Sequence, residues 1–139
     1  MRCLADLHHP QADQILVEGL RDPDLSVCEA AALALRDRPM AVAVPELVRL
    51  LASRDSLLSR LAGDALAAMG SVATPALAQA LQSLSVTERI AAARALALNL
   101  DAGAIPALCA SLADVSRLVE YWAEEGLERR GLGMVYFLP

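Results

Sequence analysis

Hydrophobic and polar positions along the chain recur with a period of thirty to thirty-one residues. Leucine and small residues return in the same order in each unit. One column is Leu35, Leu66, Leu96 and Leu127, a second is Ala31, Ala62, Ala92 and Ala123, and a third is Ala34, Ala65, Ala95 and Gly126. A unit of this length is too small to bury its own apolar face, so the pattern predicts repeated units that stack on one another.

Within each unit, the spacing of apolar residues predicts two short helices separated by a polar break. The first helix of three units opens on a proline, Pro45, Pro75 or Pro106. Proline suits the first helical turn because the N–H that it lacks would be unpaired there. The second helix is rich in alanine. The expected pairs are 11–21 with 25–36, 44–53 with 56–69, 74–83 with 86–99, and 104–113 with 115–130. Left-handed helix ends are expected at Gly70 and Asn99.

The repeat also sets the expected domain organisation, a single solenoid over residues 1–131. Leu4 lies 31 residues before Leu35, which predicts a half-repeat at 1–10. The full repeats are expected at about 11–39, 40–70, 71–100 and 101–131. The tail 132–139 breaks the pattern and is apolar and β-prone, so something should cover it. It is expected to fold back over the last helix pair or to dock on another chain, including a second copy.

Composition supports an all-α fold and disfavours several function classes. The hydrophobic fraction is 56% but the aromatic fraction is only 3%, so most apolar residues are the helix formers alanine and leucine. A net charge of -5 disfavours nucleic acid as a partner. Charged residues or prolines interrupt each apolar run, which disfavours a membrane span. The three cysteines and an N-terminus unlike a secretory signal favour a cytoplasmic location.

Several segments resemble HEAT repeats of the short bacterial type named for phycobilisome lyase subunits. They are DPDLSV at 22–27, EAAALAL at 29–35, VPEL at 44–47 and IPAL at 105–108. The resemblance covers roughly residues 1–130. It implies a right-handed α-solenoid of about four HEAT-like helix hairpins in which the second helices line a concave side. It also implies a scaffold, an assembly factor or a bilin lyase subunit of cyanobacterial type.

The alignment of the units predicts which residues are exposed on the concave side. The first such column is Cys28, Ser59, Arg89 and Glu120, and the second, one turn later, is Ala32, Gly63, Ala93 and Glu124. The family usually carries a basic residue in the first column, and this chain keeps it only at Arg89. Small residues in both columns predict a shallow groove for a partner helix or loop. The alternative is a solvated face without a partner.

Aromatic residues are confined to the C-terminal region, where Tyr121, Trp122, Tyr136 and Phe137 all lie. Trp122 aligns with positions expected in the core and is predicted to close the end of the stack. Tyr121 is the better candidate for an interface contact, because exposed aromatic residues often dominate binding energy. The residues predicted to bind a partner protein are Arg60, Arg89, Tyr121, Glu124 and Tyr136.

No catalytic, cofactor or metal site is predicted. Cys3, His8 and His9 do not match an established zinc-ligand spacing. Both histidines lie near the N-terminus, so no nucleophile with a partner histidine can be assembled. The leading hypothesis is a non-enzymatic scaffold or assembly factor that binds another protein. The alternatives are a bilin lyase-like subunit acting on phycobiliproteins, and a solenoid segment that forms a homodimer through its tail.

Overall fold

The computed structural model describes residues 10–131, with side chains from residue 13 onward. Within this range the chain forms eight α-helices, three short 3₁₀ helices and no strand, which confirms the predicted all-α class. The α-helices are α2 (Pro10–Gly19), α3 (Leu25–Asp37), α4 (Val44–Leu50), α5 (Ser56–Ala68), α6 (Thr74–Ala80), α7 (Val86–Asn99), α8 (Ile105–Ser111) and α9 (Arg117–Arg129). The 3₁₀ helices are η1 (Ala41–Ala43), η2 (Gly70–Val72) and η3 (Ala102–Ala104). The expected half-repeat at 1–10, apart from Pro10, and the tail 132–139 lie outside the described residues.

The helix boundaries agree with the sequence predictions to within about three residues. The largest differences are at the ends of α4 and α6, which are shorter than expected. The chain leaves α4 through a tighter turn, in which the N–H of Leu51 bonds to the carbonyl of Val48 three residues back. Such i to i+3 bonds commonly close a helix C-terminus. Pro45, Pro75 and Pro106 lie in the first turns of α4, α6 and α8, as predicted.

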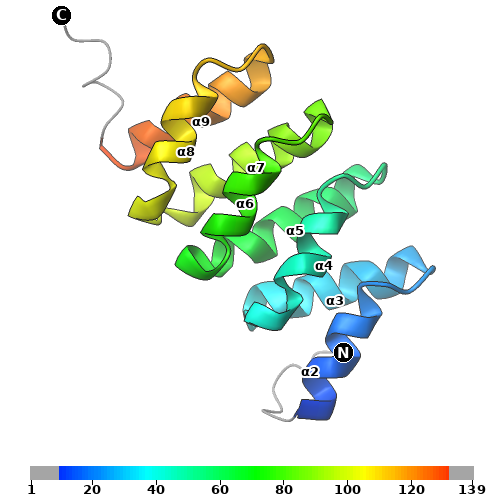
Figure 1. The fold of residues 1–139 in the computed structure, drawn as a ribbon. Coiled ribbons are helices and arrows are strands. Elements are labelled where there is room, and N and C mark those ends of the chain that lie inside the picture. Colours follow the sequence, from blue (N-terminus) through cyan, green and yellow to red (C-terminus); the bar gives the residue numbers. More distant parts are fainter. Residues whose placement is uncertain (1–9, 132–139) are drawn as a thin grey trace, which may run out of the picture.

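The helices form successive pairs that lie side by side (Figure 1). The first helix of each pair packs on the second, α2 on α3, α4 on α5, α6 on α7 and α8 on α9. The second helices also contact one another in the order α3, α5, α7 and α9. They therefore form a continuous layer, and each first helix rests against its own second helix. Figure 1 shows this progression from one end of the chain to the other.

The repeated leucine and alanine columns occupy the interior between pairs. Leu35, Leu66 and Leu96 are fully buried and Leu127 is 1% exposed. The four alanines of the second column are fully buried as well. The alanine side chain is a single methyl group, so helices that meet at alanine can pack with their backbones close together. Equivalent positions in the sequence thus have equivalent interior places, as the periodicity predicts.

Each second helix begins at the same kind of polar loop. The side chains of Asp24, Asp55, Ser85 and Ser116 accept hydrogen bonds from backbone N–H groups in the first turns of α3, α5, α7 and α9. Two residues earlier, Asp22, Ser53, Ser83 and Asp114 accept from the backbone N–H of the capping residue itself. These bonds satisfy N–H groups that the helix cannot pair internally. The polar break between helices is therefore also a repeated helix-start signal.

The predicted left-handed positions are half right. Gly70 has φ +58°, as expected for the residue after α5 and Met69. The prediction at Asn99 is wrong, because the positive φ of 59° falls on Leu100. Asn99 ends α7 instead, and its side-chain oxygen accepts hydrogen bonds from the backbone N–H of Asp101 and from Arg130. The amide group thus stabilises the turn through its side chain.

Gly126 provides a test of the close approach between second helices. A Cβ atom at this position would lie 2.9 Å from Cδ1 of Leu108 and 3.0 Å from Cα of Ala97, an atom of the α7 backbone. We expect Gly126→Ala to lower the free energy of unfolding by about 1–3 kcal/mol, because α9 must move away from α7. Urea denaturation followed by circular dichroism measures this change.

Gly63→Ala is the matched control, since its Cβ would lie no closer than 3.7 Å to a neighbouring atom. This variant should be neutral or stabilised by up to about 1 kcal/mol through helix propensity. Equal free energies of unfolding for the two variants would contradict the packing described here.

Candidate partner-binding groove

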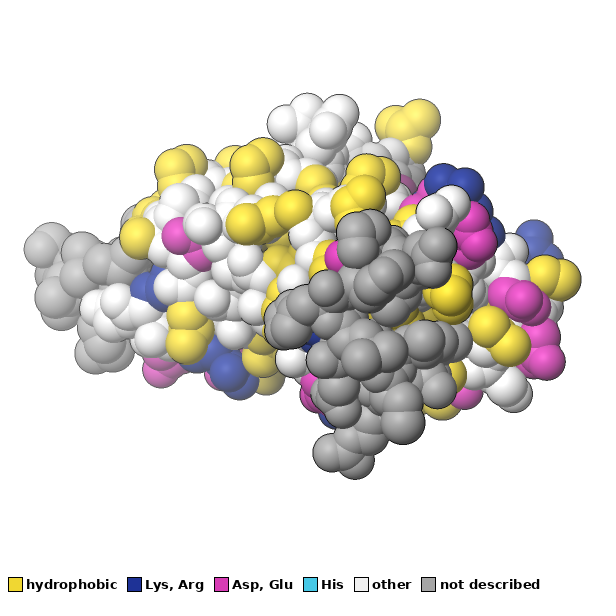
Figure 2. Space-filling model, turned by 90° about the horizontal axis from the view of Figure 1, so that it is seen from below, with side chains coloured by type: hydrophobic (Ala, Val, Ile, Leu, Met, Phe, Trp, Pro, Cys, Tyr) yellow, Lys and Arg dark blue, Asp and Glu magenta, His cyan; other side chains and the backbone are white. Residues whose placement is uncertain are grey.

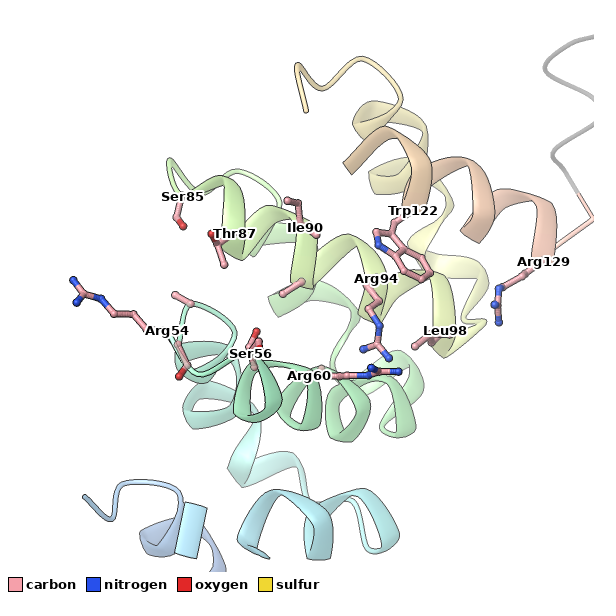
Figure 3. Close-up of a pocket in the computed structure, with 15 residues that line it drawn as sticks. Arg54, Ser56, Arg60, Ser85, Thr87, Ile90, Arg94, Leu98, Trp122 and Arg129 are labelled. Atoms are coloured by element: carbon pink, nitrogen blue, oxygen red, sulfur yellow. The ribbon is translucent and has the colours of Figure 1, made fainter. Parts of the chain in front are cut away.

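A groove of about 860 Å³ lies on the layer of second helices, along α5, α7 and α9 (Figure 3). Its apolar lining residues are Ala52, Ile90, Ala91, Leu98 and Trp122. Its basic lining residues are Arg54, Arg60, Arg94 and Arg129. Neither aspartate nor glutamate occurs among the described residues that line it. We call this feature the arginine groove.

Arg94 connects three consecutive second helices across the groove. From α7, its guanidinium forms an ion pair with Asp64 of α5, with 3.0 Å between Nη1 and Oδ1. The same guanidinium lies 6.0 Å from the ring centroid of Trp122 on α9. A cation over an indole face is attracted by the ring's negative face. Arg94 therefore holds the tryptophan at the groove wall while its own charge is balanced by Asp64.

The remaining arginines differ in how their charge is balanced. Arg129 forms an ion pair with Glu125 one turn earlier on α9, at 3.0 Å. Arg54 and Arg60 are exposed, and neither forms an ion pair with any residue in the described part of the chain. Figure 3 shows Arg60 near Arg94 and Arg54 at the opposite end, by the start of α5. The groove is thus basic although the whole chain is acidic.

Trp122 is half-buried in this groove, so the prediction that it is a buried plug at the end of the stack is wrong. The reason lies in the column to which it belongs. The aligned residues Ala30, Leu61 and Ala91 are also only partly buried. The adjacent Tyr121 is 51% exposed, and its ring meets that of Trp122 edge to face at 5.1 Å between centroids. Such a T-shaped pair is a favoured aromatic geometry.

Three residues of the column that begins with Cys28 form hydrogen bonds inside the hairpins, which corrects the prediction that they are exposed, although Ser59 also lines the groove. Cys28 is 3% exposed, and its Sγ donates to the carbonyls of Leu20 and Asp22. Ser59 is also buried, and its hydroxyl donates to the carbonyl of Leu51 at 2.8 Å. These side chains satisfy carbonyls at the end of the preceding helix. Burial, with a smaller effect of Asp22, raises the pKa of the Cys28 thiol, which disfavours the thiolate.

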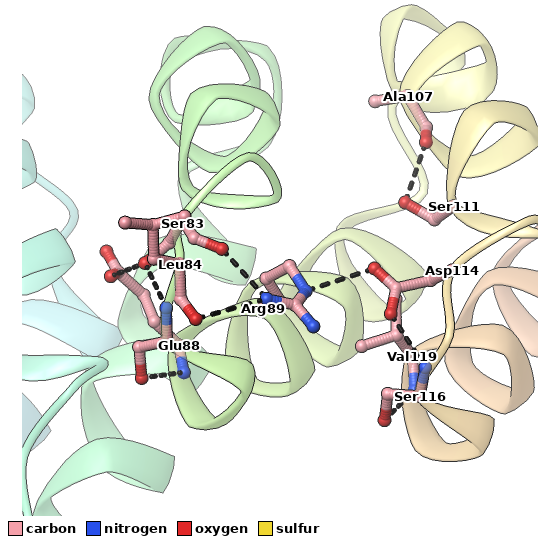
Figure 4. A network of polar contacts seen from close by, with 10 residues as sticks. Ser83, Leu84, Glu88, Arg89, Ala107, Ser111, Asp114, Ser116 and Val119 are labelled. Carbon is pink, nitrogen blue, oxygen red and sulfur yellow. Dashed lines mark hydrogen bonds and ion pairs between the residues drawn. The ribbon is translucent and has the colours of Figure 1, made fainter.

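Arg89, the third member of this column, is used inside the fold (Figure 4). Its Nε lies 3.0 Å from Oδ2 of Asp114, and its Nη1 donates to the carbonyl of Ser83 at 2.9 Å. Both side chains of the ion pair are only 15% exposed. Arg89 therefore joins the α6–α7 loop to the α8–α9 loop. These internal partners give Arg89 a structural role, and it does not line the arginine groove.

The second predicted column is buried between neighbouring second helices. Ala32, Gly63 and Ala93 are buried, so the prediction that this column is exposed is wrong, although Gly63 lines the arginine groove. A Cβ on Gly63 would lie 3.9 Å from Cβ of Ala95, which shows that this column faces the next second helix. Small residues serve this contact because they permit the helices to approach.

Glu124 occupies the same position on α9, the last helix that the structure describes. It lies with Arg117, Glu120 and Tyr121 around a shallow hollow of about 390 Å³. The corresponding face of α7 packs against α9. At Glu124, α9 therefore carries a charged residue where α3, α5 and α7 carry small ones.

The predicted binding residues thus fall in different places. Arg60 lies in the arginine groove, Tyr121 and Glu124 border the hollow beside it, and Arg89 lies in a hairpin junction. Tyr136 falls outside the described residues. Sequence reasoning missed Arg54, Ile90, Leu98 and Arg129 as groove residues. The alignment of Arg60 with Ile90 and Tyr121 was the signal available for this face.

On the face seen in Figure 2, exposed hydrophobic side chains form separate groups, with surface of other kinds between them. Leu84 and Val115 occupy equivalent loop positions and are almost fully exposed. Single apolar residues of this kind are common on protein surfaces. Neither Leu84 nor Val115 lines the arginine groove.

Within residues 10–131, no group of three or more histidine, cysteine, aspartate or glutamate side chains could hold a metal ion. Over the same range, no helix is both long and apolar enough to cross a membrane. Cys3, His8 and His9 fall outside the described residues.

No protein-family model matches the chain, and no curated protein matches it. Among solved structures, the chain is similar to the crystal structure of an engineered protein, a target of the Northeast Structural Genomics Consortium. The two are 27% identical, with a TM-score of 0.46 over 81% of this chain and 59% of that protein. The chain therefore spans less than two thirds of that protein's length, and the similarity carries no conclusion about activity.

The different roles of Arg89 and Arg60 are testable by stability measurements. Arg89→Ala removes an ion pair and a hydrogen bond that join two loops, so we expect the free energy of unfolding to fall by about 1–3 kcal/mol. Arg60→Ala, the charge-matched control, removes no internal partner and should change it by less than about 0.5 kcal/mol. Urea titration of both variants gives the comparison. A larger loss for Arg60→Ala than for Arg89→Ala would reverse the assignment.

Proposed function

We propose that the chain is a non-enzymatic scaffold or assembly factor that binds another protein through the arginine groove. The observation that carries this proposal is a groove lined by four arginines and a tryptophan without a carboxylate. Arginine and tryptophan are enriched among the residues that contribute most to protein interfaces. A cavity of about 860 Å³ is large enough for several side chains of a partner segment.

We further propose that the architecture is a right-handed HEAT-like α-solenoid of about four hairpins, preceded by a half-repeat. The repeated pairing of helices, the prolines that open α4, α6 and α8, and the recurring caps of the second helices support this proposal. In such a solenoid each unit contacts its neighbours and the layered surface is presented as a continuous binding face. The proposed likeness to phycobilisome lyase HEAT-like repeats rests on the sequence motifs at 22–27, 29–35, 44–47 and 105–108.

The groove is preorganised for binding. Asp64, Arg94 and Trp122 link α5, α7 and α9 by one ion pair and one cation–π contact. Because these side chains already have partners, less conformational entropy is lost when a ligand contacts them. Tyr121 and Glu124, in the hollow beside Trp122, extend the surface available to a larger partner.

Site-specific photo-cross-linking tests this function. We expect a protein with p-benzoylphenylalanine in place of Ile90, inside the groove, to cross-link to a discrete partner in lysate of the source organism. The same replacement at Gln79, exposed on the first helix α6, is the control and should not give that product. Mass spectrometry identifies the cross-linked protein.

A second variant connects the product to the groove. Trp122→Ala should reduce the cross-linking yield at position 90 by about tenfold or more, because truncation of an interface aromatic anchor typically costs about 2 kcal/mol or more. The same products from positions 79 and 90, or no product from either, would contradict protein binding at this groove.

A further inference from the structure

We propose that the arginine groove takes a partner segment in which acidic side chains alternate with apolar ones. Carboxylates of the segment would pair with Arg54 and Arg60, and an apolar side chain would pack against Ile90 and Trp122. This inference rests on the proposed protein-binding function and names the chemistry of its ligand.

The balance of charge in the groove selects an acidic ligand. Two of the groove arginines already have carboxylate partners, because Arg94 is paired with Asp64 and Arg129 with Glu125. Neither of these carboxylates lines the cavity. The two other arginines have no carboxylate partner in the described part of the chain. A basic or purely apolar ligand would cover these cations without compensating their lost hydration. Acidic side chains supply that compensation.

The apolar residues of the groove favour a ligand that carries apolar side chains as well as negative charge. Ile90, Ala91 and Leu98 lie on one helix, α7, and Trp122 adds the wall from α9 (Figure 3). Burying apolar surface here is favourable only if the ligand also offers apolar side chains. A nucleic acid backbone would lack such side chains and would be repelled by the net charge of -5. A protein segment with mixed acidic and apolar residues matches both parts of the cavity.

Trp122 provides a direct measurement, because it is the chain's single tryptophan and lines the groove. The probe is a short peptide without tryptophan in which glutamate alternates with leucine, added to the full chain. We expect a saturable change in tryptophan emission that weakens as ionic strength rises. Two matched peptides, with glutamine or lysine in place of glutamate, should give at least about tenfold weaker binding.

Paired variants locate the contact. Arg54→Ala with Arg60→Ala should raise the Kd of the glutamate peptide about tenfold, since two exposed ion pairs together contribute about that factor. Arg21→Ala with Arg36→Ala is the control, because it removes the same charge from exposed positions outside both the groove and the hollow beside it and should change Kd less than about twofold. Circular dichroism confirms that both proteins are folded.

Three results would overturn the inference. The first is a Trp122 emission that does not respond to the glutamate peptide, and the second is equal binding of the lysine peptide. The third is concentration-dependent self-association in sedimentation velocity that Arg60→Ala abolishes, because it would assign the groove to a second copy of this chain. The cross-linking experiment separates this inference from the proposed function. If p-benzoylphenylalanine at position 90 cross-links to a partner protein and the paired variant of Arg54 and Arg60 does not lower the yield, the groove binds a protein but does not recognise acidic side chains.

Discussion

The close approach of neighbouring second helices is the constraint on which the rest of the structure depends. It exists because the second helices carry alanine or glycine where they meet, as at Gly63 beside Ala95 and at Gly126 beside Ala97. Helices at this distance keep equivalent positions beside one another from unit to unit. Arg60 of α5 and Ile90 of α7 therefore lie on one surface although they belong to separate helices. The arginine groove is a consequence of that register.

The polar contacts reinforce the same register from the loops. Capping residues start every second helix, and Arg89 ties one hairpin loop to the next through Asp114. On the groove side, Arg94 plays a comparable part between Asp64 and Trp122. Packing sets how near the helices come, and these contacts fix how they are rotated and aligned. Together they leave Arg54 and Arg60 as the groove cations without an internal carboxylate.

Sequence reasoning predicted the fold better than the site, and the difference has a physical cause. Leucine and alanine columns report burial directly, so the helix pairs and the interior positions of Leu35 and Leu66 were predictable. The surface was misplaced by about one position along each second helix. One residue on a helix is a rotation of about 100°, enough to turn a column from solvent into a helix contact. Small residues such as Gly63 fit either environment, and sequence alone does not distinguish them.

Trp122 shows the complementary error. A tryptophan among alanines and leucines is typical of a core, yet its column is partly exposed and its ring is held at a groove by Arg94. The contact between Arg94 and Trp122 joins residues of separate repeat units, so the pattern within one unit does not predict it. The polar face of α9 was visible in the sequence as Glu120, Glu124 and Glu128. Its meaning required knowing that the same positions on α7 pack against the next helix.

Disulfide trapping measures the approach of the second helices most directly. A Cβ atom at Gly63 would lie 3.9 Å from Cβ of Ala95, a separation typical of disulfides. Gly63→Cys with Ala95→Cys, in a chain whose three native cysteines are replaced, is predicted to form an intramolecular disulfide under mild oxidation, seen by mass spectrometry as the loss of two hydrogens. Two thiols that remain free in the folded protein under the same oxidation would contradict the account.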